Sequence, residues 1–135
     1  MLRKLLIPTL VVTLAWAVLD FIMHGILLRS LYAATPALWR PLGEMKMGVI
    51  YFSTFVAALA FTSIYHNFIR PKGAPIALLY GIWFGIAHGI TFGYGSYGSM
   101  PIPYAMALTW FLGSIVEGVV AGMIVGAMVK ESAAA

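Results

Sequence analysis

Residues 104–129 read YAMALTWFLGSIVEGVVAGMIVGAMV, an apolar run in which Glu117 is the only charged side chain. The hydrocarbon core of a bilayer requires a helix of about 20 apolar residues. Three further runs of this kind cover residues 5–28, 45–68 and 74–94. The sequence therefore predicts an all-α membrane protein in which residues 1–135 form a single domain, a four-transmembrane-helix up-down bundle.

The overall composition agrees with a surface that faces lipid. Hydrophobic residues make up 62% of the chain and charged residues 9%, and the mean hydropathy is +0.97. Soluble domains average about a quarter charged residues. There is no cysteine, which excludes a disulfide framework, thiolate metal ligation and thiol catalysis.

The basic residues lie at the expected helix ends, which argues for a role in membrane orientation rather than nucleic-acid binding. Five of them fall on one side of the predicted bilayer and three on the other. The first set is Arg3, Lys4, Arg70, Lys72 and Lys130, and the second is Arg29, Arg40 and Lys46. We therefore expect both termini in the cytoplasm, in a bacterial-type inner (plasma) membrane.

The N-terminal segment has some features of a secretory signal. Arg3 and Lys4 precede an apolar stretch that contains Ala15, Trp16 and Ala17, a small-x-small pattern typical of a cleavage site. The apolar run nevertheless continues to Leu28, which is long enough to span. We expect an uncleaved first helix.

Glycine spacing in the last two predicted helices indicates close helix packing. Small residues recur every fourth position and so share one helix face, where another backbone can approach. They are Gly81, Gly85, Gly89 and Gly93 in the third helix, and Ser114, Gly118, Gly122 and Gly126 in the fourth. The two stripes either pack on each other or form a homo-oligomer interface. The run Gly93–Gly98 is interpreted as part of a flexible turn, residues 95–103.

Ionisable residues inside the apolar runs are the main functional signal. Each costs about 2.5–3.5 kcal/mol in hydrocarbon and therefore needs a reason. Asp20 and His24 lie four apart, on one face of the first helix. The rise of about 1.5 Å per residue places His88 at nearly the depth of Asp20 and Glu117 close to the midplane, with Glu44 starting the second helix on the outer side. We expect these five ion- or metal-binding candidates in the outer half of the bundle.

The first helix indicates which way these groups point. Thr13 and Ala17 continue the stripe of Asp20 and His24, so that stripe is predicted to face the bundle interior. Four residues occupy the other faces: Leu10, Leu14, Val18 and Leu28.

Three functional interpretations follow. The leading one is ion- or proton-coupled transport or conduction, in a homo-oligomer because four helices enclose little space. The main alternative is binding of a divalent metal or of a haem held by His24 and His88, in a redox or enzyme subunit. The third is a non-catalytic subunit of a larger membrane complex. No hydrolase, phosphate-loop or zincin motif is present, so no catalytic residue is assigned and the sequence does not decide whether the protein is an enzyme.

Overall fold

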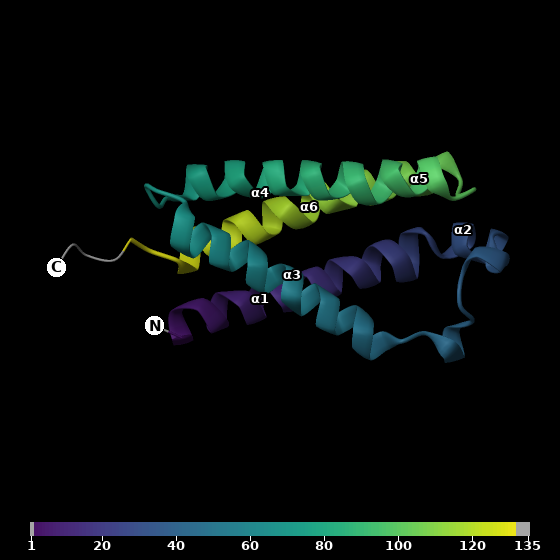
Figure 1. Ribbon diagram of the computed structural model, residues 1–135, viewed down its shortest axis with the longest axis horizontal. Helices are drawn as coiled ribbons and strands as arrows, with labels where there is room; N and C mark the ends of the chain where they lie inside the picture. The colour runs from purple at the N-terminus through teal and green to yellow at the C-terminus, as the bar shows by residue number, and fades with distance from the viewer. Residues whose placement is uncertain (1, 132–135) are drawn as a thin grey trace.

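The computed structural model describes residues 2–131 and contains only helices as regular structure. Within that part of the chain, four helices are long and apolar enough to cross a membrane. This confirms the predicted helical membrane protein. The four run over Arg3–Leu27, Met47–Phe68, Ala74–Ser99 and Tyr104–Met128 (Figure 1).

Two of the long helices change type along their length. The first consists of α1 (Leu2–Asp20) and a π-helical segment, η1 (Phe21–Leu27). The third consists of α4 (Ala74–Gly89), the π-helical η4 (Ile90–Tyr94) and α5 (Gly95–Ser99). The second and fourth are single α-helices, α3 (Met47–Phe68) and α6 (Tyr104–Met128).

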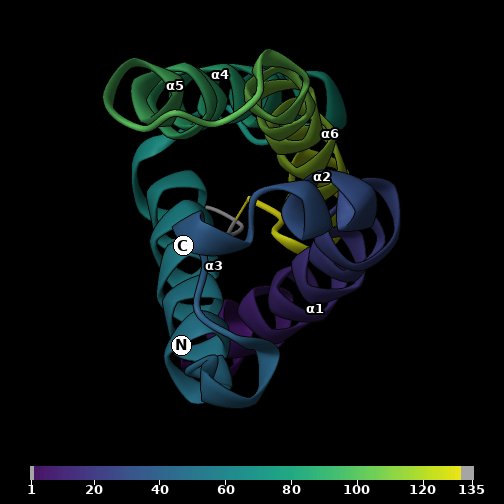
Figure 2. The same cartoon turned by 90° about the vertical axis from the view of Figure 1, so that its right-hand side faces the viewer.

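The molecule has two distinct ends. The start of α1, the link between α3 and α4 and the end of α6 lie together, and we call this the terminal end (Figure 1). The segment after α1, the start of α3 and α5 lie at the opposite end, which we call the loop end. Viewed along the bundle, α4, α6, α1 and α3 follow one another around its circumference (Figure 2).

The third long helix extends further than the sequence indicated. The predicted turn from residue 95 is wrong, because α5 continues the helix to Ser99. The hydroxyl of Ser99 donates to the carbonyl oxygens of Gly95 and Ser96. Tyr97 packs edge-on against Tyr104 at the start of α6, with 5.8 Å between ring centroids. These contacts hold a glycine-rich helical turn that intrinsic propensity alone would disfavour.

The segment between the first two long helices folds back over the bundle. It contains α2 (Arg29–Ala34) and two short 3₁₀ turns, η2 (Pro36–Leu38) and η3 (Leu42–Glu44). Leu28 is buried, 2% exposed, contrary to its predicted outward position. The π-helical turn before it and the fold-back of α2 place it in a loop-end apolar cluster, which also contains Met23, Ile102, Met106, Ala107 and Trp110.

The helices α4 and α6 are in backbone contact along a seam of glycines. A Cβ atom built on Gly81 would lie 2.1 Å from the carbonyl oxygen of Gly118, and the reverse distance is also 2.1 Å. A Cβ on Gly85 would lie 2.5 Å from the carbonyl oxygen of Ser114, and one on Gly122 2.5 Å from that of Ala77. Only glycine permits this approach. A Cβ atom built on Gly89, Gly93 or Gly126, the remaining stripe glycines, would lie 2.6–2.8 Å from an atom of the partner helix.

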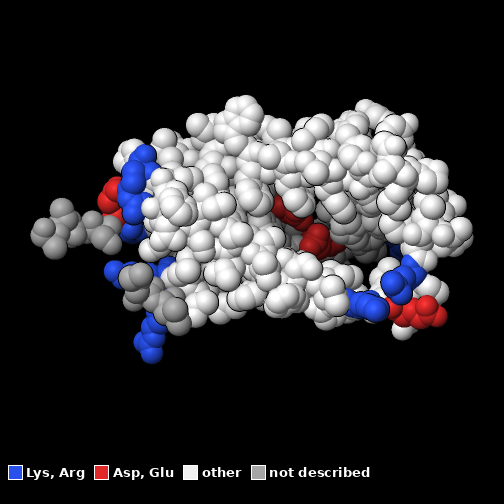
Figure 3. Space-filling model, viewed as in Figure 1, with Lys and Arg blue, Asp and Glu red and all other residues white. Residues whose placement is uncertain are grey.

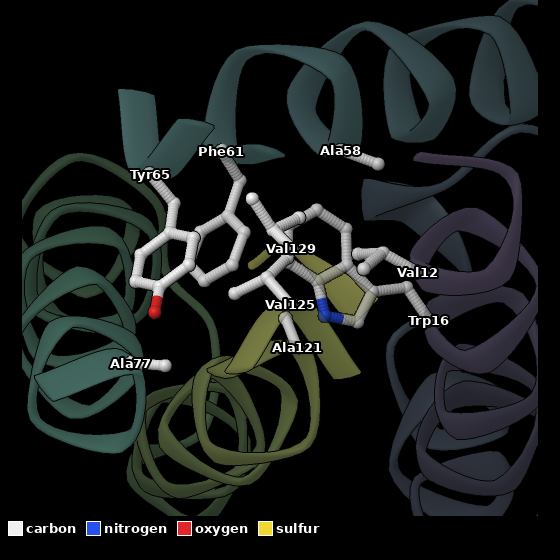
Figure 4. Close-up of a cluster of buried hydrophobic side chains, with 9 residues drawn as sticks. All are labelled: Val12, Trp16, Ala58, Phe61, Tyr65, Ala77, Ala121, Val125 and Val129. Atoms are coloured by element: carbon white, nitrogen blue, oxygen red, sulfur yellow. The ribbon is translucent and has the colours of Figure 1, made fainter. Parts of the chain in front are cut away.

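A second apolar cluster fills the terminal half of the bundle and contains residues from all four long helices (Figure 4). Phe61 of α3 stacks on Tyr80 of α4, with 4.5 Å between centroids, and packs edge-on against Phe84 at 4.9 Å. Toward the loop end α3 diverges from α4 (Figures 1 and 2), and residues 47–53 are all exposed. Side-chain contacts between α3 and α4 therefore lie in the terminal half of the bundle, and the two helices separate toward the loop end. The clustered residues are Val12, Trp16, Ala58, Phe61, Tyr65, Ala77, Ala121, Val125 and Val129.

Candidate functional site

Two acidic side chains meet in the middle of the molecule. Asp20 is the last residue of α1 and Glu117 lies in the middle of α6. Their carboxyl groups are close enough to interact directly. Figure 3 shows two acidic side chains together in a recess, far from the charged residues at both ends. The side chain of Asp20 is 36% exposed there, so the recess reaches the carboxyl pair.

Glu117 is held in place through its backbone, while its carboxyl group keeps unused bonding capacity. The indole Nε1 of Trp16 donates to the carbonyl oxygen of Glu117 at 2.9 Å, which ties α1 to α6. The carboxyl atom Oε1 of Glu117 is buried and has no hydrogen-bond partner among the described residues. Leaving a buried polar atom unpaired costs about 1–3 kcal/mol. A shared proton or a bound cation would remove this cost.

His24 connects the carboxyl pair to the loop end. Its Nε2 lies 3.6 Å from Oδ1 of Asp20, and its Nδ1 is hydrogen-bonded to the hydroxyl of Tyr32 in α2. That hydroxyl also accepts the Nε1–H of Trp110 at 3.2 Å.

One donor in this chain is fixed by its chemistry. An indole nitrogen only donates, so Tyr32 accepts from Trp110, whereas the bond between Tyr32 and Nδ1 of His24 runs in the direction set by the tautomer of the imidazole. Burial raises the pKa of Tyr32 to about 12, and the phenol therefore keeps its proton at physiological pH.

His88 reaches the same region from α4. Its Nδ1 lies 3.3 Å from the hydroxyl oxygen of Ser114 on α6, three residues before Glu117. The glycine seam causes this placement, because Gly85 and Gly89 bring α4 directly onto Ser114. The site thus combines side chains from three of the long helices.

The structure brings four of the five predicted site residues together and leaves one apart. Asp20, His24, His88 and Glu117 lie in one region, as described above. Glu44 lies in η3 at the loop end, where it is exposed and makes no side-chain hydrogen bond or ion pair within residues 2–131.

Sequence reasoning missed three aromatic members of the site. Tyr32, Trp16 and Trp110 were not among the predicted site residues. Trp110 lies seven residues before Glu117, which puts both on one face of α6. That spacing is the signal from which it could have been found.

The predicted metal or haem site gains no support from the arrangement. Within the described part of the chain, no three His, Cys, Asp or Glu side chains are grouped so that they could hold a metal ion. Ligation usually requires three or four such side chains. Binding of a divalent metal or of haem stays a prediction.

Comparison with known proteins does not assign a family. No protein-family model, curated protein or solved structure matches this chain. Function is therefore inferred from the chemistry of the site itself.

Proposed function

We propose that this protein transports a cation across the membrane in exchange for protons, with Asp20 and Glu117 as the shared binding pair. The observation that carries the proposal is the proximity of these two acidic side chains, from α1 and α6, in a recess of helices apolar enough to span a bilayer (Figure 3). Acidic residues at such depth characterise ion pathways and proton relays.

Electrostatics explains why such a pair would exchange a proton for a cation. Two negative charges 4 Å apart repel by about 4 kcal/mol even at an effective dielectric constant of 20. Paired carboxyl groups in apolar surroundings therefore hold one proton between them, and a bound cation relieves the same repulsion. A site that accepts either species, but not both, couples their movements.

The hydrogen-bond chain from Asp20 suggests a route for the proton. His24 presents Nε2 to Asp20 and Nδ1 to Tyr32. An imidazole with both nitrogens engaged can pass a proton from one side to the other. Because Tyr32 belongs to α2 at the loop end, this route leads from the middle of the bundle toward that end.

The exposure of Asp20 favours a binding site over a purely structural pair. A pair of carboxyl groups that only fixed the relative position of two helices would be buried, but the side chain of Asp20 is 36% exposed. Exposure of a carboxylate to acyl chains would cost about 2.5–3.5 kcal/mol. We infer that the recess is occupied by water or by a cation rather than by lipid tails.

The proposal includes a topology. An up-down bundle with both termini in the cytoplasm of a bacterial-type inner membrane is supported by the excess of basic residues at the terminal end, five against three. Assembly as a homo-oligomer is supported by the small size of the chain, because four helices enclose little space for a pathway.

The test is proton flux in proteoliposomes that contain a pH-sensitive dye and carry an imposed cation gradient. Glu117→Gln and Asp20→Asn each remove one carboxylate at constant size, and both are expected to abolish coupled flux. Glu44→Gln removes an exposed carboxylate outside the site and should leave flux unchanged. Full flux in both site variants would reduce the cluster to a structural role.

A further inference from the structure

We infer that the recess beside Asp20 and Glu117 binds a bulky lipophilic organic cation, such as a quaternary ammonium or phosphonium ion, which enters sideways from the bilayer. This inference rests on the proposed function and specifies its substrate class. It is carried by three observations: an aromatic ladder beside the carboxyl pair, the small number of oxygen ligands there, and the side on which the recess opens.

The ladder runs along α4 and η4 and crosses to α6. The ring of His88 stacks between those of Phe84 and Phe92, at centroid distances of 6.4 and 5.8 Å and interplanar angles of 10° and 17°. Phe92 stacks in turn on Trp110 at 4.6 Å, and Phe84 on Trp16 at 6.3 Å. Aromatic faces attract cations within about 6 Å of the ring centre.

The ladder and the carboxyl pair belong to one site. The ring of Trp110 lies 6.3 Å from that of His24, whose Nε2 is 3.6 Å from Oδ1 of Asp20. At the two ends of the ladder, Trp16 is hydrogen-bonded to the backbone of Glu117, and Trp110 to Tyr32. A ligand beside the two carboxyl groups would therefore be close to stacked rings.

The available ligands suit a diffuse charge better than a hard inorganic ion. Calcium takes about six to eight oxygen ligands, more than two carboxyl groups supply. The site offers two carboxyl groups, and no three potential ligand side chains within residues 2–131 are grouped for a metal. An organic cation needs only charge balance from the carboxyl pair and contact with apolar and aromatic surface.

The opening is on the side where a lipophilic cation would arrive. The aromatic contacts between α3 and α4 involve Phe61 and Tyr65 in the terminal half, and α3 diverges toward the loop end (Figure 1). His88 and Phe92 lie on this side and are exposed, Phe92 to 40%. A cation dissolved in the bilayer can therefore reach the carboxyl pair from the side of the bundle, where the recess opens (Figure 3).

The experiment compares two probes of equal size and opposite charge by calorimetric titration of the detergent-solubilised full-length protein. Tetraphenylphosphonium is expected to bind saturably, and more weakly as the pH falls because protons compete for the carboxyl pair. Tetraphenylborate is expected not to bind. Equal binding of both probes, or undiminished phosphonium binding by Glu117→Gln, would overturn the inference.

A matched pair of aromatic substitutions tests the ladder. Phe92→Leu should weaken phosphonium binding by about threefold or more, because the cation–π contact is lost while the apolar volume is largely kept. Phe52→Leu alters an aromatic ring on α3 that is 66% exposed and outside the ladder, and it should leave binding unchanged. Equal effects of the two substitutions would assign the ladder to packing alone.

The two proposals can fail separately. Proton flux driven by an inorganic cation, with no phosphonium binding, would leave the transport proposal standing and overturn the substrate class. Phosphonium binding that depends on Glu117, without any coupled flux, would overturn transport and leave the binding site.

Discussion

The helix α6 packs against its two neighbours in different ways. Against α4 the contact is backbone to backbone, with Gly81 and Gly118 so close that a Cβ on either would lie 2.1 Å from a carbonyl oxygen. Against α1 the contact is made by side chains. Met23 covers Gly113, and Trp16 donates to the carbonyl oxygen of Glu117.

The difference determines where a site can form. Backbone contact leaves no space for a side chain or ligand, so α4 and α6 form a rigid pair. Side-chain contact leaves gaps and allows rotamer changes, and the carboxyl pair lies on this second interface. We expect any movement that exposes the site alternately to the two sides of the membrane to occur between α1 and the α4–α6 pair.

The largest expected effect comes from breaking the backbone interface. Gly118→Ala places a methyl group 2.1 Å from the carbonyl oxygen of Gly81, and neither backbone can yield locally. We expect a loss of at least about 3 kcal/mol in unfolding free energy, at the upper end for overpacking. Thermal unfolding in detergent, followed by circular dichroism, measures the loss.

The same substitution on the other face of α6 is the control. A methyl group at Gly113 would meet Sδ of Met23, 2.2 Å away. A methionine side chain is flexible and can move, so Gly113→Ala should cost roughly 1 kcal/mol. If both substitutions proved equally costly, the contrast between the two interfaces would be lost.

A smaller effect is expected from the polar chain on the α1 side. Tyr32→Phe keeps the ring but removes the hydroxyl that bridges His24 and Trp110. Two partly buried polar groups lose their partner, and we expect a destabilisation of about 1–3 kcal/mol. The thermal midpoint at pH 8 is the measurement.

The pH dependence of the stability difference between the parent protein and Tyr32→Phe tests the raised pKa of Tyr32. An unfolded tyrosine ionises near pH 10, whereas burial raises the pKa of Tyr32 to about 12 in the fold. The folded state then binds the phenolic proton of Tyr32 more tightly than the unfolded state does. The contribution of this group to the unfolding free energy is therefore complete below pH 10 and is lost as the pH rises through 12. The excess stability of the parent protein over Tyr32→Phe should shrink across this range. A constant difference would contradict the raised pKa.

The smallest effect is expected at the terminal end, far from both interfaces. Arg70 and Glu131 form an ion pair at 3.5 Å, with both side chains about half exposed. Exposed pairs contribute about 0–1 kcal/mol. Glu131→Gln should therefore lower the unfolding free energy by less than about 1 kcal/mol. This difference from the parent protein should shrink as salt is added, because salt screens the ion pair in the parent. A larger loss of unfolding free energy would contradict the view that this exposed ion pair contributes little to stability.

Local sequence features account for the helices and for part of the site. Four apolar runs of spanning length follow from the requirement that backbone polar groups be satisfied inside a bilayer. The neighbourhood of Asp20 and His24 follows from their spacing of four residues on one helix. The position of the third helix end did not follow, because Gly95 and Gly98 signal a turn and only the packing of Tyr97 on Tyr104 makes that segment helical.

The chain by itself determined that polar groups would lie at the depth of an apolar membrane core, since depth depends only on distance along a helix. Tertiary structure alone decided which of them meet. Glu117 faces Asp20 because glycines set the position of α6 against α4 and Trp16 ties α1 to α6. Glu44 stays apart because the segment before α3 diverges from the bundle. Contacts between helices depend on the rotation and separation of whole elements, which are properties of packed surfaces and not of any single stretch of sequence.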